Sequence, residues 1–383
     1  MSLASSSLVQ QFRTRRHLAA TKRVVAGFDG FVDRIVVPIA LRHGPGDDFI
    51  PIATMAEFAL RVHGAAGRST NIELYQRMEK LGGNGPIMTS ALLASGTQVK
   101  YLGALGATRP VPPLAAFAAR SDAITLCAPG ITTALEFSDG KLMLGLMAGF
   151  DELNYIRIVE RVGGEGILCD LIASADLISL VNWTMLPHMT EIFHAFVEKL
   201  LPRIPPGKDR FFFFDLADPE KRAEAELLEA LQTISHFEPF GHVTLGLNLK
   251  EAEHVGHLFG FALATEEPTE LKQLAASLRT RLAIDTVVIH PRKSAACATA
   301  EGAFWVAGPY CETPLVTTGA GDHFNAGFVL GQLIGLTPDA CLATGVSTSG
   351  FYVRSGTSPT LDDLDKLLMQ ESRGNSEPLA ART

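Results

Sequence analysis

The stretch Val316–Thr317–Thr318–Gly319–Ala320–Gly321–Asp322–His323–Phe324–Asn325–Ala326–Gly327–Phe328 joins a glycine-rich turn, an acid and the start of an apolar helix. Glycine permits a tight turn that brings backbone N–H groups close to a ligand. A helix N-terminus offers unpaired N–H donors and a partial positive charge, which suit a phosphate. The same residues also fit an ordinary turn in which Asp322 caps the helix. By itself the stretch predicts a turn before a helix and leaves its function open.

The composition is that of a folded protein. Of the 383 residues, 47% are hydrophobic and 19% are charged, which indicates a real core rather than disorder. The net charge of -8 argues against nucleic acid or an anionic membrane as the main partner. Five scattered cysteines without a C-x-x-C pair favour neither zinc nor a disulfide framework. Residues 1–20 lack the apolar core of a signal peptide, and no run is long enough to span a bilayer, so we expect a cytoplasmic protein.

Apolar strands alternate with helical segments through most of the chain, which predicts an α/β fold. Continuously apolar strands of this kind imply a mostly parallel sheet that helices cover on both faces. The expected strands are 23–26, 98–102, 177–180, 211–214, 243–247 and 286–289. The expected helices are 85–95, 186–201, 221–234, 249–259, 269–283, 322–334 and a small-residue helix at 343–350.

Two further pairs of short strands predict a small second sheet. The segments 35–40 and 49–52 flank a polar turn, and 132–137 and 142–147 flank Ser138–Asp139–Gly140, a strong hairpin turn. These strands are too short to form a core of their own, so the sheet should project from the main body. We expect an N-terminal segment at 1–22, a main domain at 23–371 with small-sheet strands at about 34–53 and 131–148, and a flexible tail at 372–383.

Polar residues follow two of the expected elements near the N-terminus. In Gly27–Phe28–Asp29–Gly30–Phe31–Val32–Asp33, both acids could bind hydroxyls, although Asp29 before a glycine is equally typical of a turn. Asp33 is better placed for a ligand. The segment Leu81–Gly82–Gly83–Asn84–Gly85–Pro86 exposes amides at a helix start, and a tight loop capped by Asn84 explains it equally well.

A third polar segment, Leu247–Asn248–Leu249–Lys250–Glu251, leads from a buried strand into a helix. Its spacing is that of a capping box with Asn248 as the cap. It is also compatible with Asn248 and Glu251 facing the sheet edge and holding a hydrated Mg²⁺, which prefers oxygen ligands. The spacing leaves both interpretations open.

In order and content these segments resemble the ribokinase-like (PfkB-type) carbohydrate kinase family, over roughly residues 23–368. The resemblance implies a central sheet flanked by helices, a small β lid over the sugar site, ATP as co-substrate, Mg²⁺, and a possible homodimer through the lid. It implies Asp322 as the base, and Gly319, Ala320 and Gly321 as an anion hole. The implied ligand contacts are Asp33, Gly82, Gly83 and Asn84 to the sugar, Asn248 and Thr318 to the nucleotide, and Glu251 with Asn248 to Mg²⁺ through water.

The chain departs from the family pattern at two places. Ile87 stands where an asparagine commonly contacts the sugar, and Asn84 is the candidate replacement. His290–Pro291 replaces a Thr-x-Gly turn near the nucleotide. The following Arg292 and Lys293 either bind nucleotide phosphate or form an exposed basic turn, and ADP remains an alternative donor.

The predicted activity is transfer of the terminal phosphoryl group of a nucleotide to a hydroxyl of a small sugar or sugar-like substrate. The two departures leave a second hypothesis, a catalytically silent binding protein on the same scaffold. A third is a kinase of a non-sugar alcohol such as a vitamin precursor. The sequence leaves the substrate, the donor and the oligomeric state open.

Overall fold

Two sheets organise the residues that the computed structural model describes, which are 6–205, 209–261 and 265–372. The large sheet has nine strands in the order β14-β13-β12-β11-β10-β9-β1-β5-β6. Pairing is parallel from β12 to β6 and antiparallel at β13 and β14. The mostly parallel sheet is therefore confirmed. Its strands are β1 Arg23–Phe28, β5 Gln98–Gly103, β6 Ile124–Thr125, β9 Leu177–Val181, β10 Phe211–Asp215, β11 His242–Leu247, β12 Thr286–Ile289, β13 Ser294–Thr299 and β14 Gly302–Ala307.

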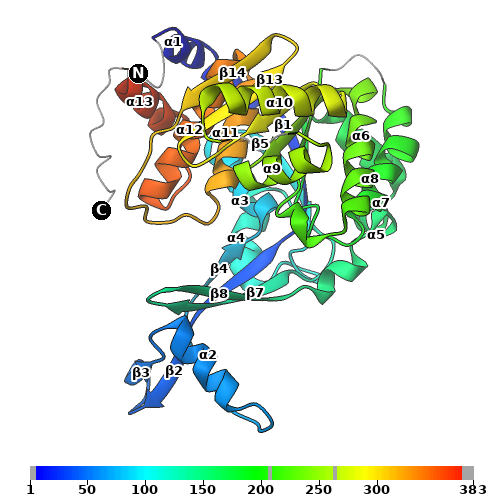
Figure 1. The fold of residues 1–383 in the computed structure, drawn as a ribbon. Coiled ribbons are helices and arrows are strands. Elements are labelled where there is room, and N and C mark those ends of the chain that lie inside the picture. The colour runs from blue at the N-terminus through cyan, green and yellow to red at the C-terminus, as the bar shows by residue number, and fades with distance from the viewer. Residues whose placement is uncertain (1–5, 206–208, 262–264, 373–383) are drawn as a thin grey trace.

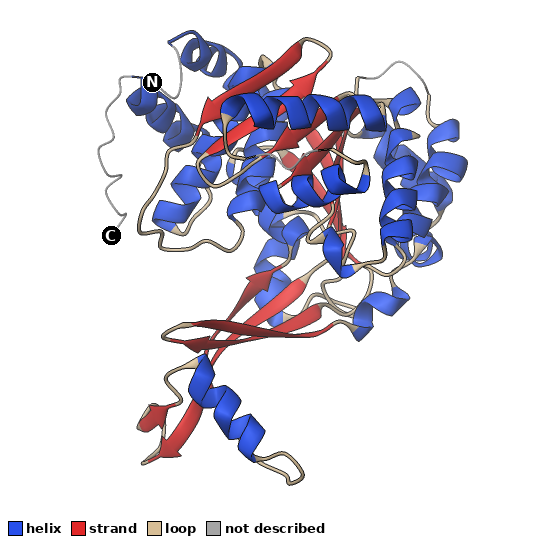
Figure 2. Cartoon of the chain, in the orientation of Figure 1, coloured by secondary structure: helices blue, strands red, loops and turns tan. Residues whose placement is uncertain are grey.

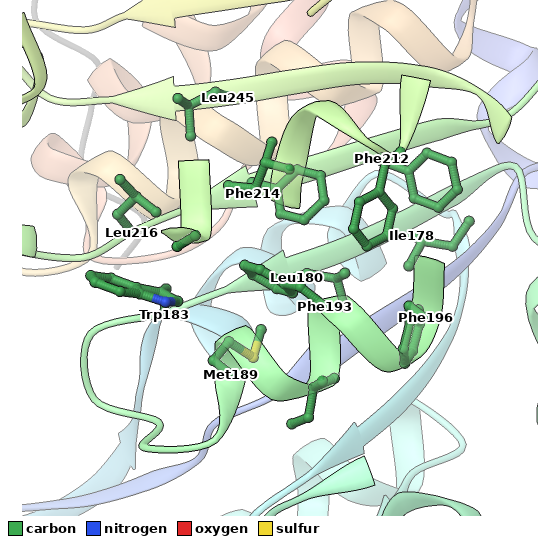
Figure 3. Packing of buried hydrophobic residues seen from close by; sticks show 14 of the residues in the cluster. Ile178, Leu180, Trp183, Met189, Phe193, Phe196, Phe212, Phe214, Leu216 and Leu245 are labelled. Carbon is green, nitrogen blue, oxygen red and sulfur yellow. The ribbon is translucent and has the colours of Figure 1, made fainter. Parts of the chain in front are cut away.

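Side chains of the buried strands alternate between two hydrophobic cores, one on each face of this sheet. Phe212 and Phe214 of β10 enter one core, whereas Phe213 enters the other. Figure 3 shows Phe212 and Phe214 packed with Phe193 and other residues of the first core. Helices therefore cover the sheet on both sides (Figure 2).

The first core lies under one group of helices: α5 Tyr155–Val162, α6 Glu165–Ser174, α7 Met189–Ala195, α8 Glu224–Ser235, α9 Leu249–Leu258 and α10 Pro268–Leu282. The second lies under the other group: α1 Ser6–Arg15, α3 Asn84–Ala94, α4 Pro112–Arg120, α11 Ala320–Leu333, α12 Pro338–Ser355 and α13 Leu361–Ser372. The prediction of one continuous helix at 186–201 was wrong. A loop precedes Met189, and the α7 helix passes into a π-helical turn at Phe196–Leu200 and a 3₁₀ turn at Leu201–Arg203.

The two helices that follow the glycine-rich turn pack closely, as their small residues predict. A Cβ atom added at Gly327 of α11 would lie 2.3 Å from Thr348 Oγ1 of α12. Only glycine allows this approach. The contact fixes the direction of α11, and with it the position of the turn at its N-terminus.

The N-terminal segment packs against the C-terminal helix. Leu8, Val9 and Phe12 of α1 are buried in the second core, and Arg13 Nε donates to Asp365 Oδ1 of α13 at 2.6 Å. The expected tail lies outside the described residues from 373 onward. No helix in the described ranges is both long and apolar enough to cross a membrane.

The small sheet, here called the lid sheet, projects from the body below the carboxyl edge of the large sheet (Figure 1). Its strands are β2 Phe31–Arg42, β3 Phe49–Pro51, β4 Leu74–Gly82, β7 Gly130–Phe137 and β8 Gly140–Leu146. The helix α2, Met55–Gly64, joins it and buries none of its residues. The sequence did not predict β4, whose mostly exposed, partly charged side chains lack a strand pattern. It forms because its backbone pairs antiparallel with β2 along its length.

Candidate active site

The glycine-rich turn opens α11 as the sequence predicts. Gly319 has φ +89°, in the left-handed region that disfavours any side chain. A Cβ atom there would also lie 3.1 Å from Ile87 Cγ2. The N–H of Ala320 donates to the carbonyl of Thr317 at 3.2 Å. Within residues 6–205, 209–261 and 265–372, no acceptor meets the N–H groups of Gly319 or Gly321, so two donors at this helix start stay available to a ligand.

Asp322 lies in the first turn of α11 and is 8% exposed. Its Oδ1 accepts a hydrogen bond from Asn84 Nδ2 at 3.0 Å. Burial raises its pKa to about 8, because a charged carboxylate is poorly solvated there. The hydrogen bond from Asn84 opposes this shift, whereas the nearby charges of Asp29 and Glu251 add to it. A carboxyl that gains and loses its proton near neutral pH is suited to proton transfer.

The second glycine segment lies directly beside Asp322. The strand β4 ends at Gly82, and α3 begins at Asn84. Asp29, which follows β1, caps this helix from outside. Its Oδ2 accepts from the N–H of Asn84, and its Oδ1 from the N–H of Gly85, both at 2.9 Å. Asp29 is therefore neither a simple turn residue nor an open ligand contact.

Asp29 is completely buried, and two further side chains hold it. Asn182 Nδ2 donates to Oδ2 at 2.7 Å, and the Tyr101 hydroxyl donates to the carbonyl of Asp29 at 2.7 Å. Burial raises its pKa to about 6, and these hydrogen bonds oppose the rise. Sequence reasoning missed Asn182 and Tyr101, because neither stands in a motif. The left-handed backbone of Asn182, with φ +63°, is visible only in the structure.

Asp33 and the glycine pair meet through the pairing of β2 with β4. A Cβ atom added at Gly82 would lie 2.4 Å from Asp33 Oδ1, and one at Gly83 would lie 2.8 Å from Asp29 Oδ2. Burial raises the pKa of Asp33, and the charge of Lys80 opposes the shift. The residues expected at the sugar, Asp33, Gly82, Gly83 and Asn84, thus lie together at the junction of the lid sheet with the body.

Asn248 and Glu251 form a complete capping box at the start of α9. Asn248 Oδ1 accepts from the N–H of Glu251 at 3.0 Å, and Glu251 Oε2 accepts from the N–H of Asn248 at 2.8 Å. Glu251 Oε1 accepts from the N–H of Asp218 at 3.0 Å. Burial raises the pKa of Glu251. With both oxygens so engaged, Glu251 fits a hydrated Mg²⁺ held through water better than direct coordination.

Other ligands for a metal ion are few at this edge. In the described part of the chain, no three His, Cys, Asp or Glu side chains form a metal-binding group. Mg²⁺ commonly keeps several waters and uses substrate phosphates with one or two carboxylates. The donors present fit that mode of binding.

Asp215 is a buried acid whose position after the apolar run 211–214 is compatible with a substrate contact, although a loop start explains it more simply. It ends β10, and its Oδ2 accepts from Asn325 Nδ2 of α11 at 2.7 Å. Burial raises its pKa well above the ordinary value, and the charges of Glu251 and Asp322 add to the rise. A polar residue at the carboxyl end of a buried strand was the signal that pointed to it.

A pocket of about 660 Å³ borders the glycine-rich turn. Ala320 and Gly321 line it, together with Asn248, Arg292, Tyr310 and Thr318. This volume suits a ligand of nucleotide size. The turn therefore borders this pocket through Ala320 and Gly321, and the acid that follows them bonds Asn84 among the sugar-side residues.

The basic turn after β12 contributes unequally to this pocket. Arg292 lines it, whereas Lys293 lies beside its wall with Nζ 4.9 Å from the centre of the Tyr310 ring. His290 also lines it and packs its ring against Phe324 at 4.7 Å. Burial lowers the pKa of His290 to about 4, so this imidazole is neutral at physiological pH.

Most of the chain is similar in sequence to known kinases. The family model of prokaryotic ketohexokinase matches residues 9–371. A ketohexokinase of Haloferax volcanii is 28% identical over 344 residues, which cover 89% of both chains.

Solved structures share the fold at low identity. The nucleoside kinase of Methanocaldococcus jannaschii, an archaeal member of the ribokinase family, matches with a TM-score of 0.59 at 13% identity, over 91% of this chain and 98% of its own. The ribokinase of Arabidopsis thaliana complexed with ribose and ATP matches with a TM-score of 0.59 at 14% identity, over 91% and 98%. A carbohydrate kinase from Agrobacterium tumefaciens matches with a TM-score of 0.60 at 16% identity, over 91% of this chain and 97% of its own. The chain is a carbohydrate kinase of the ribokinase-like (PfkB-type) fold and belongs to the prokaryotic ketohexokinase family.

Proposed function

We propose that the protein transfers the terminal phosphoryl group of ATP to a hydroxyl of a ketohexose. The sugar class is that of the ketohexokinase relative, and the donor is that bound to the plant ribokinase. One observation carries the proposal. The buried carboxyl of Asp322 bonds Asn84 of the sugar-side junction and directly follows Ala320 and Gly321, which line the pocket, at a helix start where the Gly319 and Gly321 amides are free.

In the proposed reaction, the acceptor oxygen forms a bond to the γ-phosphorus while the bond from that phosphorus to the bridging oxygen breaks. ADP leaves, and Asp322 takes the hydroxyl proton as general base. In the anion hole of Gly319, Ala320 and Gly321, the free amides of Gly319 and Gly321 stabilise the charge on the transferred group, whereas the Ala320 amide shares its hydrogen with the Thr317 carbonyl. Bound Mg²⁺ would neutralise phosphate charge, held through water by Asn248 and Glu251.

The ligand contacts follow from position. Asp33, Gly82, Gly83 and Asn84 bind sugar hydroxyls where the lid sheet meets the body. Asn248, Thr318 and Arg292 bind the nucleotide from the pocket wall, and Lys293 adds positive charge at its rim. The lid sheet covers the sugar and excludes water.

The lid sheet also offers a surface for a homodimer. Large apolar side chains are exposed on it: Leu41, Ile50, Leu74, Met78, Met143, Leu144 and Leu146, with Met55, Leu60 and Val62 of α2. Exposed apolar clusters of this kind are typical of interfaces. Pairing of two lid sheets would cover them.

A substrate panel tests the proposal. Purified protein is assayed with ketohexoses, aldohexoses, ribose, nucleosides and a vitamin-precursor alcohol, with ATP or ADP as donor. We expect ATP-dependent phosphorylation of a ketohexose, and a kcat about 10²–10⁴-fold lower in Asp322→Asn with folding intact. Normal turnover by that variant would refute the base. Preference for ribose, nucleoside or vitamin precursor would refute the sugar class. Ligand-induced stabilisation without any turnover would instead favour the silent binder.

A further inference from the structure

The helices α3 and α11 carry the two sides of the acceptor site and meet at one side-chain hydrogen bond. Asn84 is the first residue of α3, and its Nδ2 donates to Asp322 Oδ1 at 3.0 Å. An asparagine at a helix start commonly caps its own helix. Here Asp29 takes that role by accepting from the N–H groups of Asn84 and Gly85. The Asn84 side chain is therefore free to reach across to the second helix.

Buried groups hold the backbone of Asn84 in place. Its N–H donates to Asp29 Oδ2 at 2.9 Å. Asn182 Nδ2 donates to that oxygen at 2.7 Å, and Tyr101 Oη donates to the Asp29 carbonyl at 2.7 Å. Because these partners are buried, the backbone at the start of α3 is fixed, and from there the Asn84 side chain reaches Asp322.

One helical turn further along α3, Ile87 lies beside the glycine-rich turn that opens α11. Its Cγ2 lies 3.1 Å from where a Cβ of Gly319 would stand. The helix thus presents Asn84 to the acid and Ile87 to the glycine that opens α11. This face of α3 supports the catalytic turn, which explains how an apolar residue is accommodated at position 87.

We propose that Asn84 is a positioning residue, whose Nδ2 fixes Asp322 Oδ1 and leaves Oδ2 to receive the proton of the acceptor hydroxyl. The inference rests on the proposed role of Asp322 as the base. It assigns Asn84 an action on the base in addition to any contact with the sugar.

The charges around Asp322 make its hydrogen bond with Asn84 important for the ionisation of this acid. The charges that act most on Asp322 are the carboxylates of Asp29 and Glu251, and both disfavour its ionised form. Asp215 of β10, Tyr101 of β5 and Tyr352 of α12 also face this acid. Next to the same turn, His290 and His323 are kept neutral by burial, which lowers the pKa of each to about 4. The bond from Asn84 is the largest interaction that favours the Asp322 carboxylate.

The test is the pH profile of kcat/KM for the sugar in Asn84→Ala. Losing the donor raises the pKa of Asp322 further, so less of the base is ionised at neutral pH. We expect kcat/KM about tenfold lower at pH 7, recovering toward wild type near pH 9.5. Asn84→Asp keeps the shape of the side chain but places a carboxyl beside Asp322. Its kcat/KM at pH 7 should therefore fall further than that of Asn84→Ala. The matched control is Ser90→Ala on α3, where Ser90 Oγ bonds only the carbonyl of Pro86, and its profile should match wild type.

The outcomes separate this inference from the proposed function. Profiles that run parallel to wild type, with only KM for the sugar raised, would make Asn84 a sugar contact and overturn the inference. If Asn84→Ala does not fold, Asn84→Ser, whose shorter hydroxyl cannot span to Asp322, must show the same displaced profile. Normal turnover by Asp322→Asn would instead refute the base itself. A Carbon-13 titration of the Asp322 carboxyl in wild type and Asn84→Ala gives a readout without turnover, and an unchanged midpoint would also overturn the inference.

Discussion

The carboxyl edge of the large sheet and the lid sheet distribute polar and apolar groups in opposite ways. At the edge, Asp29 and Asp322 are 0% and 8% exposed. On the lid sheet, Leu144 and Leu146 are 50% and 69% exposed. Proteins usually bury apolar side chains and expose charged ones, because buried charge and exposed apolar surface both raise the free energy of the folded state.

The difference follows from how each region is built. The large sheet has a hydrophobic core on either face, which offsets the cost of a few buried acids. The lid sheet is a single layer, and the helix that joins it, α2, buries none of its own residues. We therefore interpret the edge as a site organised for chemistry and the lid as a surface that needs a second surface.

The largest expected effect comes from substituting Gly319 at the carboxyl edge of the large sheet. Gly319→Ala should lower kcat about 10²–10³-fold, because a Cβ at φ +89° strains the turn and displaces the amides that face the phosphoryl group. Steady-state kinetics of phosphorylation measures this loss. The control is Gly96→Ala, at φ +85° with open space around it, which shares the backbone strain away from the site. Equal loss of kcat in both variants would contradict the role of the turn.

The next effect concerns the cost of burying Asp322. Its pKa is raised to about 8 from the ordinary 3.8, so the folded state keeps a proton that the unfolded state releases. Wild-type stability therefore falls as pH rises from about 4 to about 8. Asp322→Asn should remove this loss and be more stable near pH 8 by on the order of a few kcal/mol. Thermal unfolding from pH 4 to pH 9 checks this, with Asp47→Asn in the lid as control. Identical pH dependence in wild type and Asp322→Asn would exclude a costly buried acid.

On the lid, the comparison predicts a change of assembly rather than of chemistry. Leu144→Lys puts a charge into the apolar surface and should weaken self-association at least about tenfold. Analytical ultracentrifugation over a concentration series measures it. Ile156→Lys is the control, since Ile156 is a more exposed apolar residue of the body, at 75%. A protein that is monomeric before substitution would remove the lid dimer from consideration.

The smallest effect contrasts a histidine at the edge with one on the lid. His323 is buried, stacks on Tyr352 at 3.6 Å, and has its pKa lowered to about 4. A lowered pKa disfavours its protonated form in the folded state, so stability is lost as pH falls from 6.5 toward 4. His323→Gln should reduce this loss by about 1 kcal/mol at pH 5.5. Chemical denaturation at pH 7 and 5.5 measures it, and exposed His63→Gln on α2 should change nothing. Equal acid sensitivity in His323→Gln and wild type would count against burial of a neutral imidazole.

Local signals in the sequence predicted much of the fold. Apolar runs such as 211–214 gave the buried strands, because a strand covered on both faces must be apolar throughout. Ser138–Asp139–Gly140 predicted the turn between β7 and β8, and the Asn248–Glu251 spacing predicted a capping box that the structure contains in full. The glycine-rich turn gave the start of α11. Each of these depends only on residues that are close in sequence.

The tertiary structure decided what these local elements meet. The strand β4 has no strand pattern and exists through its pairing with β2. Asp29, for which the sequence left a turn and a ligand contact equally open, caps a helix 55 residues away, and Asn84 bonds an acid 238 residues away. The sequence by itself determined which residues form a turn, a cap or a strand, because backbone preferences act locally. Only the packed structure decided which carboxyls are buried, which donors hold them and hence their pKa values, because burial and hydrogen bonding depend on distant parts of the chain.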